Sequence, residues 1–154
     1  MSRWPIPGKV SKPTRTRVLF LCVGNACRSQ MAEAIARHLA GDVIEASSAG
    51  LAPFGEIPAT TLAVLAERGF SATGQHSKPL RTEHLSATDL LINMTGQRGT
   101  SLFNHPTPPL EDWMVGDPYG YSLPVYRAIC NQIEARVADL AKRLRDSVKV
   151  SQTA

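Results

Sequence analysis

A continuous apolar run, Val18-Leu19-Phe20-Leu21-Cys22-Val23, leads directly into the polar segment Gly24-Asn25-Ala26-Cys27-Arg28-Ser29. An uninterrupted apolar run of this length is typical of a strand that is buried on both faces of a sheet. Ser29 can cap a helix that follows, because apolar residues then recur at helical spacing until Gly41. The sequence therefore predicts a strand, a loop and a helix in succession, with the loop at the carboxyl end of the strand.

The rest of the chain continues this alternation of strands and helices. We expect strands over residues 43–48, 89–94 and 110–113, and helices over residues 58–69, 82–87 and 123–146. The last helix has the clearest pattern, because its apolar residues step mostly by three or four and form one stripe. Strands that alternate with helices form βαβ units, so the pattern predicts an α/β fold around a mostly parallel sheet.

Length and composition fit one globular domain. The chain has 154 residues, of which 43% are hydrophobic and 19% charged, and these values exclude a disordered or collagen-like protein. The formal charge of +4 is unevenly placed, since residues 1–17 hold five of the 17 bases and no acid. The other 12 bases and all 13 acids leave a net charge of −1 for the rest. We therefore divide the chain into a basic N-terminal arm (residues 1–16), one folded domain (17–148) and a C-terminal tail (149–154).

Nothing in the sequence predicts secretion or membrane insertion. The basic arm lacks the apolar stretch of a signal peptide, and no run approaches the ~20 apolar residues of a membrane helix. Three cysteines, two of them only five positions apart, do not make a secreted disulfide framework. We expect a cytoplasmic protein, whose thiols are either reactive or plain core residues.

The loop after the first strand has the features of an anion-binding site. A loop that enters a helix directs several backbone N–H groups at one point, where the helix dipole adds positive potential. Gly24 and Asn25 can take left-handed conformations that bend these amides into a nest, and the Arg28 guanidinium can bind two oxygens of a tetrahedral oxyanion. At the base of this cradle, Cys22 would be held as a thiolate nucleophile, with Ser29 donating a hydrogen bond to it. The alternative is a buried cysteine at the end of a strand and an unrelated surface arginine.

Four linked motifs resemble those of one enzyme family. Residues 18–34 are similar to the phosphate loop and first helix of low-molecular-weight protein tyrosine phosphatases and the related thioredoxin-coupled type arsenate reductases. Ser48-Ala49-Gly50, residues 89–94 and Asp117-Pro118-Tyr119 resemble later segments of that family, in the same order. The resemblance implies a flavodoxin-like three-layer sandwich, with a four-stranded parallel sheet and helices on both faces. It also makes residues 17–148 a phosphatase domain.

The resemblance implies a role for each polar residue of the site. Cys22 would attack phosphorus and form a phosphocysteine, while Asp117 would protonate the leaving oxygen and later accept a proton from water. Arg28 and the loop amides would compensate the charge of the phosphate, so that no metal or other cofactor is needed. The phosphate-binding residues would be Val23, Gly24, Asn25, Ala26, Cys27, Arg28 and Ser29. The residues that support the loop would be Asn25, Ser29 and Ser48. Metal binding is not indicated either, because the four histidines are scattered without ligand spacing.

Aromatic residues near the predicted cleft concern the choice of substrate. Phe54 stands where a tryptophan often lines the cleft in the family, and Tyr119 follows the proposed acid by two positions. Together with Trp113, these rings could frame a phosphotyrosine side chain. If they do not, the enzyme would favour another phosphomonoester. The expected partners are thus a phosphorylated protein or a small phosphomonoester, and we expect a monomer or weak dimer.

Four other residues have a functional and a structural interpretation. Cys27 could form a reversible disulfide with Cys22 that protects the nucleophile from oxidation, or it could simply pack under the loop. Cys130 lies on the apolar stripe of the last helix, which favours core packing. His76 and Asp89 resemble a structural hydrogen-bonded pair of the family.

Two other functions remain open from the sequence. The same cradle would accept arsenate, which is nearly isosteric with phosphate. The thioredoxin-coupled relay uses two further cysteines after the third strand, but none lies between Cys27 and Cys130, so arsenate reduction would need an external thiol. A non-catalytic module could instead bind anions or nucleic acid through the basic arm. The arm has only Trp4 as an aromatic residue, and we expect no nucleic-acid partner. The primary prediction is hydrolysis of phosphate monoesters, with protein phosphotyrosine as the expected substrate.

Overall fold

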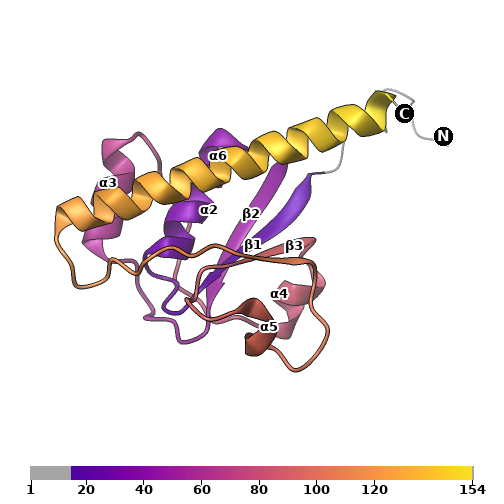
Figure 1. Cartoon of the computed structure of the whole chain (residues 1–154). Helices are drawn as coiled ribbons and strands as arrows, with labels where there is room; N and C mark the ends of the chain where they lie inside the picture. Colours follow the sequence, from indigo (N-terminus) through magenta and orange to yellow (C-terminus); the bar gives the residue numbers. More distant parts are fainter. Residues whose placement is uncertain (1–14, 154) are drawn as a thin grey trace, which may run out of the picture.

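The computed structural model describes residues 15–153, which fold around a four-stranded parallel sheet (Figure 1). The strands β1 (Thr16–Cys22), β2 (Ile44–Gly50), β3 (Leu90–Asn93) and β4 (Leu110–Asp112) lie in the order β2-β1-β3-β4. The predicted strand at residues 18–23 is thus the central β1, which pairs with β2 on one side and β3 on the other. Most of the predicted N-terminal arm lies outside the described residues.

Helices cover both faces of the sheet, as predicted. Helices α2 (Arg28–Leu39), α3 (Ala59–Glu67) and α6 (Leu123–Thr153) pack on one face, where α6 crosses α2 and α3 (Figure 1). The short helices α4 (Thr82–Ser86) and α5 (Gly99–Leu102) lie on the other face. This arrangement is the predicted three-layer α/β sandwich. No helix within residues 15–153 combines the length and the apolar character needed to cross a bilayer.

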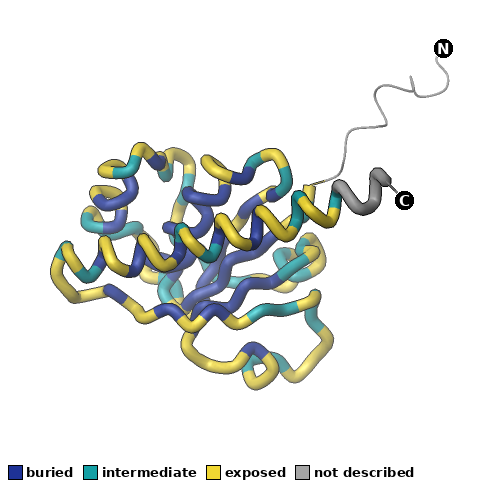
Figure 2. The backbone as a smooth tube through the Cα atoms, turned by 45° about the horizontal axis from the view of Figure 1, so that its top comes forward, coloured by how far each residue is buried: buried dark blue, intermediate teal, exposed yellow. Residues whose placement is uncertain are grey.

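Alternate residues of β1 face two different cores, which explains why its sequence is apolar from Val18 to Cys22. Val18, Phe20 and Cys22 face the larger core with α2, α3 and α6, whereas Leu19 and Leu21 face the smaller core on the other side. Figure 2 shows the strands as the most continuously buried part of the chain. Because both faces of β1 are packed, the end of the strand is fixed in position, and so is the start of the loop that follows it.

Several helix boundaries differ from the sequence prediction. Ser29 is not the N-cap of α2, because the helix begins at Arg28 and Cys27 occupies the cap position without a side-chain hydrogen bond, two residues earlier than predicted. Thr82 is likewise inside α4, whose cap is Arg81. Helix α6 continues to Thr153, seven residues beyond its predicted end at residue 146, and α5 was not predicted at all.

Gly50, the last residue of β2, permits the close approach of the loop that follows β1. A Cβ atom at this position would lie 2.7 Å from the carbonyl oxygen of Val23 and 2.9 Å from the backbone nitrogen of Asn25. The backbone of Gly50 is also tied to the segment before α4, since its N–H donates to Lys78 O at 2.9 Å and its carbonyl accepts from Leu80 N at 2.9 Å. The loop thus packs against a position where only glycine fits.

Candidate active site

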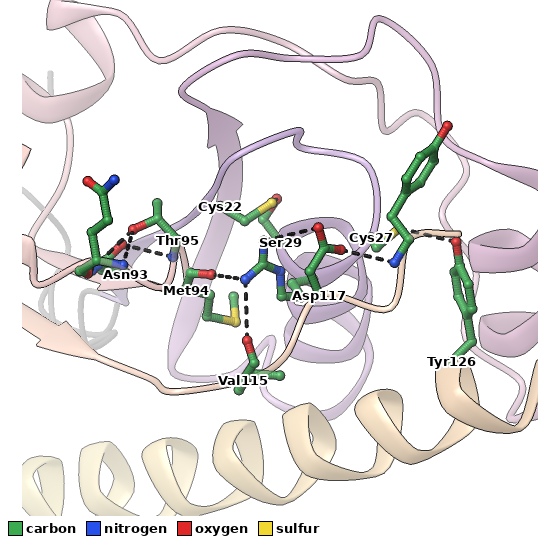
Figure 3. A network of polar contacts seen from close by, with 12 residues as sticks. Cys22, Cys27, Ser29, Asn93, Met94, Thr95, Val115, Asp117 and Tyr126 are labelled. Carbon is green, nitrogen blue, oxygen red and sulfur yellow. Dashed lines mark hydrogen bonds and ion pairs between the residues drawn. The ribbon is translucent and has the colours of Figure 1, made fainter. Parts of the chain in front are cut away.

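The loop between β1 and α2 lies at the carboxyl end of the central strand and brings Cys22 next to Ser29. Cys22 is the last residue of β1 and is almost completely buried. Its Sγ lies 2.9 Å from Ser29 Oγ in the first turn of α2. A strand that is packed on both sides and the start of a long helix therefore position the two side chains (Figure 3).

Asn25 takes the left-handed conformation predicted for the loop, with φ of 47°. The same prediction is wrong for Gly24, which is not among the residues with positive φ in the described chain. Gly24 serves another purpose, because a Cβ there would lie 3.2 Å from Cε1 of Phe54. One residue therefore bends the loop, and the other lets an aromatic ring lie against it.

Hydrogen bonds leave the Ser29 hydroxyl hydrogen free to be donated to the Cys22 sulfur. Asn25 Nδ2 donates to Ser29 Oγ at 2.7 Å, while Asn25 Oδ1 accepts the backbone N–H of Lys78 at 2.9 Å. Since a backbone N–H can only donate, it establishes which end of the Asn25 amide is oxygen. The Ser29 oxygen thus accepts from Asn25, and its hydrogen is available for Cys22. This arrangement stabilises a negative charge on the sulfur.

Arg28 is buried beside the loop and leaves one donor without a partner. Its Nη1 donates to the carbonyl oxygens of Met94 and, at 3.3 Å, Val115 (Figure 3). Its Nη2 lies 3.7 Å from Asp117 Oδ2. The buried Nε has no hydrogen-bond partner among the described residues. A buried charged donor without a partner is costly, so this atom indicates where an anion would be accepted.

Asp117 lies at the rim of the cradle, with about half of its side chain exposed. Its Oδ1 accepts the backbone N–H of Tyr119 at 3.1 Å, which orients the carboxylate, while Oδ2 lies toward Arg28. A carboxyl group in this place is accessible to solvent and near the position of an oxyanion bound at Arg28. It can therefore exchange protons with a leaving group or with water.

Phe54 and Tyr119 meet above the cradle. Their ring centroids are 4.6 Å apart in an edge-on contact, and each residue is about half exposed. Both line the cavity that contains Cys22, Arg28 and Asp117, whose volume is only about 10 Å³. This is room for roughly one water molecule.

Trp113 does not take part in this cleft, so its predicted contribution to the substrate wall is wrong. The residue is buried and packs against Phe20, with ring centroids 5.9 Å apart. Its Nε1 donates to Glu111 at 3.2 Å, and the Arg136 guanidinium lies 6.0 Å from the ring centroid. Trp113 therefore anchors the segment after β4 to α6.

Ser48 is buried in β2 and contacts α2 rather than the loop itself. Its Oγ donates to Glu33 Oε1 at 2.6 Å. Glu33 is almost completely buried, and its second oxygen is paired with Arg37 one turn further along α2. Ser48 therefore connects β2 to the helix that begins at the cradle, and any support for the loop acts through that helix.

All three cysteines are free thiols. Cys27 lines the same cavity as Cys22, but its Sγ donates to Tyr126 Oη on α6 at 3.6 Å. Burial raises the pKa of the Cys27 thiol, which favours its protonated form. Cys130 is fully buried in α6 within the larger core, and burial also raises its pKa. Of the three thiols, Cys22 is the one that lies beside Ser29 Oγ.

The predicted pair of His76 and Asp89 is wrong. Both oxygens of Asp89 accept hydrogen bonds from Arg17, at 2.9 Å from Nη2 and at 2.8 Å from the backbone N–H. These hydrogen bonds hold the pKa of Asp89 below its ordinary value. His76 contributes its backbone carbonyl instead, which accepts from Gln30 Nε2 at 3.0 Å. Asp89 therefore connects β1 to the start of β3.

The sequence analysis missed three groups that contact the cradle. Two are the backbone carbonyls that hold Arg28, and no residue type predicts them. The third is the side chain of Gln30, whose Nε2 lies 3.0 Å from Asn25 Oδ1. The sequence did contain a signal for Gln30, because a polar side chain in the first turn of a buried helix needs hydrogen-bond partners nearby. Within residues 15–153, no group of three or more potential ligands could hold a metal ion.

This geometry agrees with the family to which the chain belongs. Residues 17–150 match the family model of low molecular weight phosphotyrosine protein phosphatases. The chain is therefore a member of that family, as the sequence motifs predicted.

Relatives in this family bear the names of different activities. A glutaredoxin arsenate reductase of Synechocystis is 34% identical over 135 residues, covering 83% of this chain and 98% of that protein. A protein-arginine-phosphatase of Geobacillus stearothermophilus is 32% identical over 143 residues, covering 84% and 96%. The structure of a thioredoxin-dependent arsenate reductase of Corynebacterium glutamicum is 34% identical, with a TM-score of 0.72, covering 92% of this chain and 67% of that one. The family thus includes both phosphatases and arsenate reductases.

Proposed function

We propose that this protein hydrolyses phosphate monoesters, with phosphotyrosine in proteins as the preferred substrate, through a phosphocysteine on Cys22. One observation carries the proposal: Ser29 is placed to donate to Cys22 at 2.9 Å within a cavity that also holds Arg28 and the accessible carboxyl group of Asp117. These are a nucleophile, an oxyanion site and a proton donor, which together suffice for phosphoryl transfer.

The reaction would proceed in two displacements at phosphorus. In the first, the Cys22 sulfur forms a bond to phosphorus while the bond to the ester oxygen breaks, and Asp117 gives its proton to that oxygen. In the second, water attacks the phosphocysteine, Asp117 accepts a proton from the water, and the sulfur leaves as a thiolate stabilised by Ser29. Arg28 and the loop amides hold the non-reacting oxygens throughout.

The aromatic rings at the cavity mouth support a phosphorylated tyrosine. Phe54 and Tyr119 already make an edge-on contact with each other, and a tyrosyl ring that separated them would replace that contact by two similar ones. Because about half of each residue is exposed, both rings can be reached by a side chain carried by a protein.

Arsenate reduction is the second candidate, because relatives of comparable similarity bear that name. The loop that follows β3 contains Thr95 and Gln97 and no cysteine. Arsenate would replace one oxygen by the Cys22 sulfur, with loss of water. An external thiol would then attack that sulfur, so that the two sulfurs form a disulfide and their two electrons reduce arsenic from the pentavalent to the trivalent state.

Hydrolysis of an aryl phosphate and reduction of arsenate with a small thiol should be measured side by side. We expect phosphatase turnover that Cys22→Ser abolishes and that Asp117→Asn slows while phosphocysteine still forms, as detected by mass spectrometry of quenched enzyme. Arsenate reduction by a wild-type protein without phosphatase turnover would refute the proposal and favour the second candidate.

A further inference from the structure

Gln30 is fully buried beneath the loop, and the steps described so far do not use its side chain. Its Nε2 lies 3.1 Å from Asn25 O, 3.0 Å from Asn25 Oδ1 and 3.0 Å from His76 O. Three acceptors surround one nitrogen, and two of them belong to the residue that bends the loop. This amide therefore supports Asn25 together with the backbone N–H of Lys78, which donates to Asn25 Oδ1 at 2.9 Å.

The orientation of the Gln30 amide is determined by backbone groups. Its nitrogen faces the backbone carbonyls of Asn25 and His76, which can only accept. Its oxygen faces Gln75 Nε2 at 2.7 Å, and the same Gln75 nitrogen donates to the backbone carbonyl of Gln30 at 3.1 Å. Gln75 takes this orientation although its own buried Oε1 is left without a partner among the described residues. Only one assignment of donors satisfies this set of contacts.

We propose that Gln30 is a positioning residue for catalysis, which holds Asn25 so that the Ser29 hydroxyl donates its hydrogen to the Cys22 sulfur. The donors form one directed series, from Gln75 to Gln30, then to Asn25, then to Ser29 and finally to Cys22. Such a series polarises each donor in turn. Gln30 itself does not touch the substrate.

The expected effect follows from the end of this series. When Gln30 is replaced by methionine, which has a similar length and no donor, Asn25 loses one donor at each of its oxygens and keeps only the Lys78 N–H at Oδ1. Asn25 then holds the Ser29 hydroxyl toward the sulfur less firmly, and a negative charge on the sulfur is less stabilised. A hydrogen bond to a charged group alters an equilibrium by about tenfold or more. The substitution leaves in place the other ionisable groups that line the cavity, which are Cys27, Arg28, Asp117 and Tyr119.

The test is the rate of alkylation of Cys22 by iodoacetamide as a function of pH, followed by peptide mass mapping. Gln30→Met should move the midpoint of the profile to higher pH and lower the rate at pH 7 by about tenfold or more. The plateau at high pH should stay unchanged, because the sulfur is then ionised in both proteins. Gln132→Met, an exposed site on α6, is the matched control and should reproduce the wild-type profile.

A double-mutant cycle separates positioning from a general loss of stability. If Gln30 acts through Ser29, then Gln30→Met must have no further effect on the profile of Ser29→Ala. A wild-type profile for folded Gln30→Met, or an equal shift in both backgrounds, would overturn the proposal. If Gln30→Met does not fold, the same alkylation profiles are measured for Gln75→Met, which changes the half-buried first residue of the series. The same outcomes then support or overturn the proposal.

This inference rests on the proposed function only in taking Cys22 as the nucleophile. Alkylation requires no phosphate ester, so the two proposals fail separately. A shifted profile in a protein without phosphatase turnover would refute the proposed substrate and leave the role of Gln30 intact. An unshifted profile in an active phosphatase would refute the role of Gln30 and leave the proposed function intact.

Discussion

Replacing Gly50 by alanine should misplace the phosphate loop from a position outside it. The new Cβ would meet Val23 O at 2.7 Å and the backbone nitrogen of Asn25 at 2.9 Å. Both atoms belong to the main chain, so neither can move by a change of rotamer. The strand cannot retreat either, because Gly50 is hydrogen-bonded to Lys78 and Leu80 on its other side. The loop must therefore shift by a few tenths of an ångström or more.

The magnitude follows from the cost of such overpacking, about 1–3 kcal/mol of the free energy of unfolding. For a chain of this size, this corresponds to a Tm lower by roughly 2–12 °C. Activity should fall further, because a misplacement approaching 1 Å costs on the order of 100-fold in rate. Thermal unfolding followed by circular dichroism and kcat/KM for an aryl phosphate measure the two effects.

The matched control is Gly116→Ala, whose Cβ would lie at an ordinary 3.7 Å from Ile129 Cδ1. Its Tm should equal that of the wild type. A Gly50→Ala protein with unchanged Tm and unchanged kcat/KM would refute the reasoning, since it would mean that the loop and β2 are not in the contact that the structure shows.

Two further predictions concern the cavity mouth and acid stability. Phe54→Ala should lower the preference for aryl over alkyl phosphates, measured as the ratio of kcat/KM, by roughly two- to tenfold, because it removes one aromatic contact. Tyr121→Ala, an exposed aromatic residue outside the cavity, is the control, and an unchanged ratio in Phe54→Ala would contradict the role of the ring. Four carboxyl groups have their pKa lowered chiefly by hydrogen bonds from arginines, so stability is full above the ordinary carboxyl pKa of about 4 and declines as the pH falls through the lowered values. The four groups are Asp42, Glu67, Asp89 and Glu111. Tm should therefore be constant from pH 7 to about 5 and fall below about pH 4, and this fall should be less steep in high salt. A Tm that stays constant down to pH 3 would contradict this prediction.

Most of the fold was predictable because its signals are local. The apolar run at residues 18–23 and the stripe on the last helix identified β1 and α6 without any knowledge of their partners. The errors concern ends of elements and short elements. Cys27 caps α2 although it makes no side-chain cap bond, and the four residues of α5 have too few positions to show a periodicity.

The placement of the candidate site residues was predictable to a similar degree. Cys22, Arg28 and Ser29 lie within eight consecutive positions, so a single loop brings them together and their proximity can be inferred from spacing. Asp117 lies far along the chain, and only its resemblance to a known motif suggested that it would meet Arg28, to which it lies at 3.7 Å. The aromatic residues were harder, since Phe54 and Tyr119 contact each other whereas Trp113 is buried elsewhere.

The sequence by itself determined the class of fold and the loop that brings Cys22, Ser29 and the Arg28 guanidinium together, because these depend on residues that are neighbours in the chain. Only the tertiary structure decided which polar groups meet: Asp89 with Arg17 rather than with His76, Ser48 with Glu33, and Gln30 with Asn25. Each of these contacts depends on the register and packing of separate elements or on the folding of a loop back over a helix. A hydrogen bond requires placement to within a few tenths of an ångström, and the pattern of residue types along a chain does not contain that information.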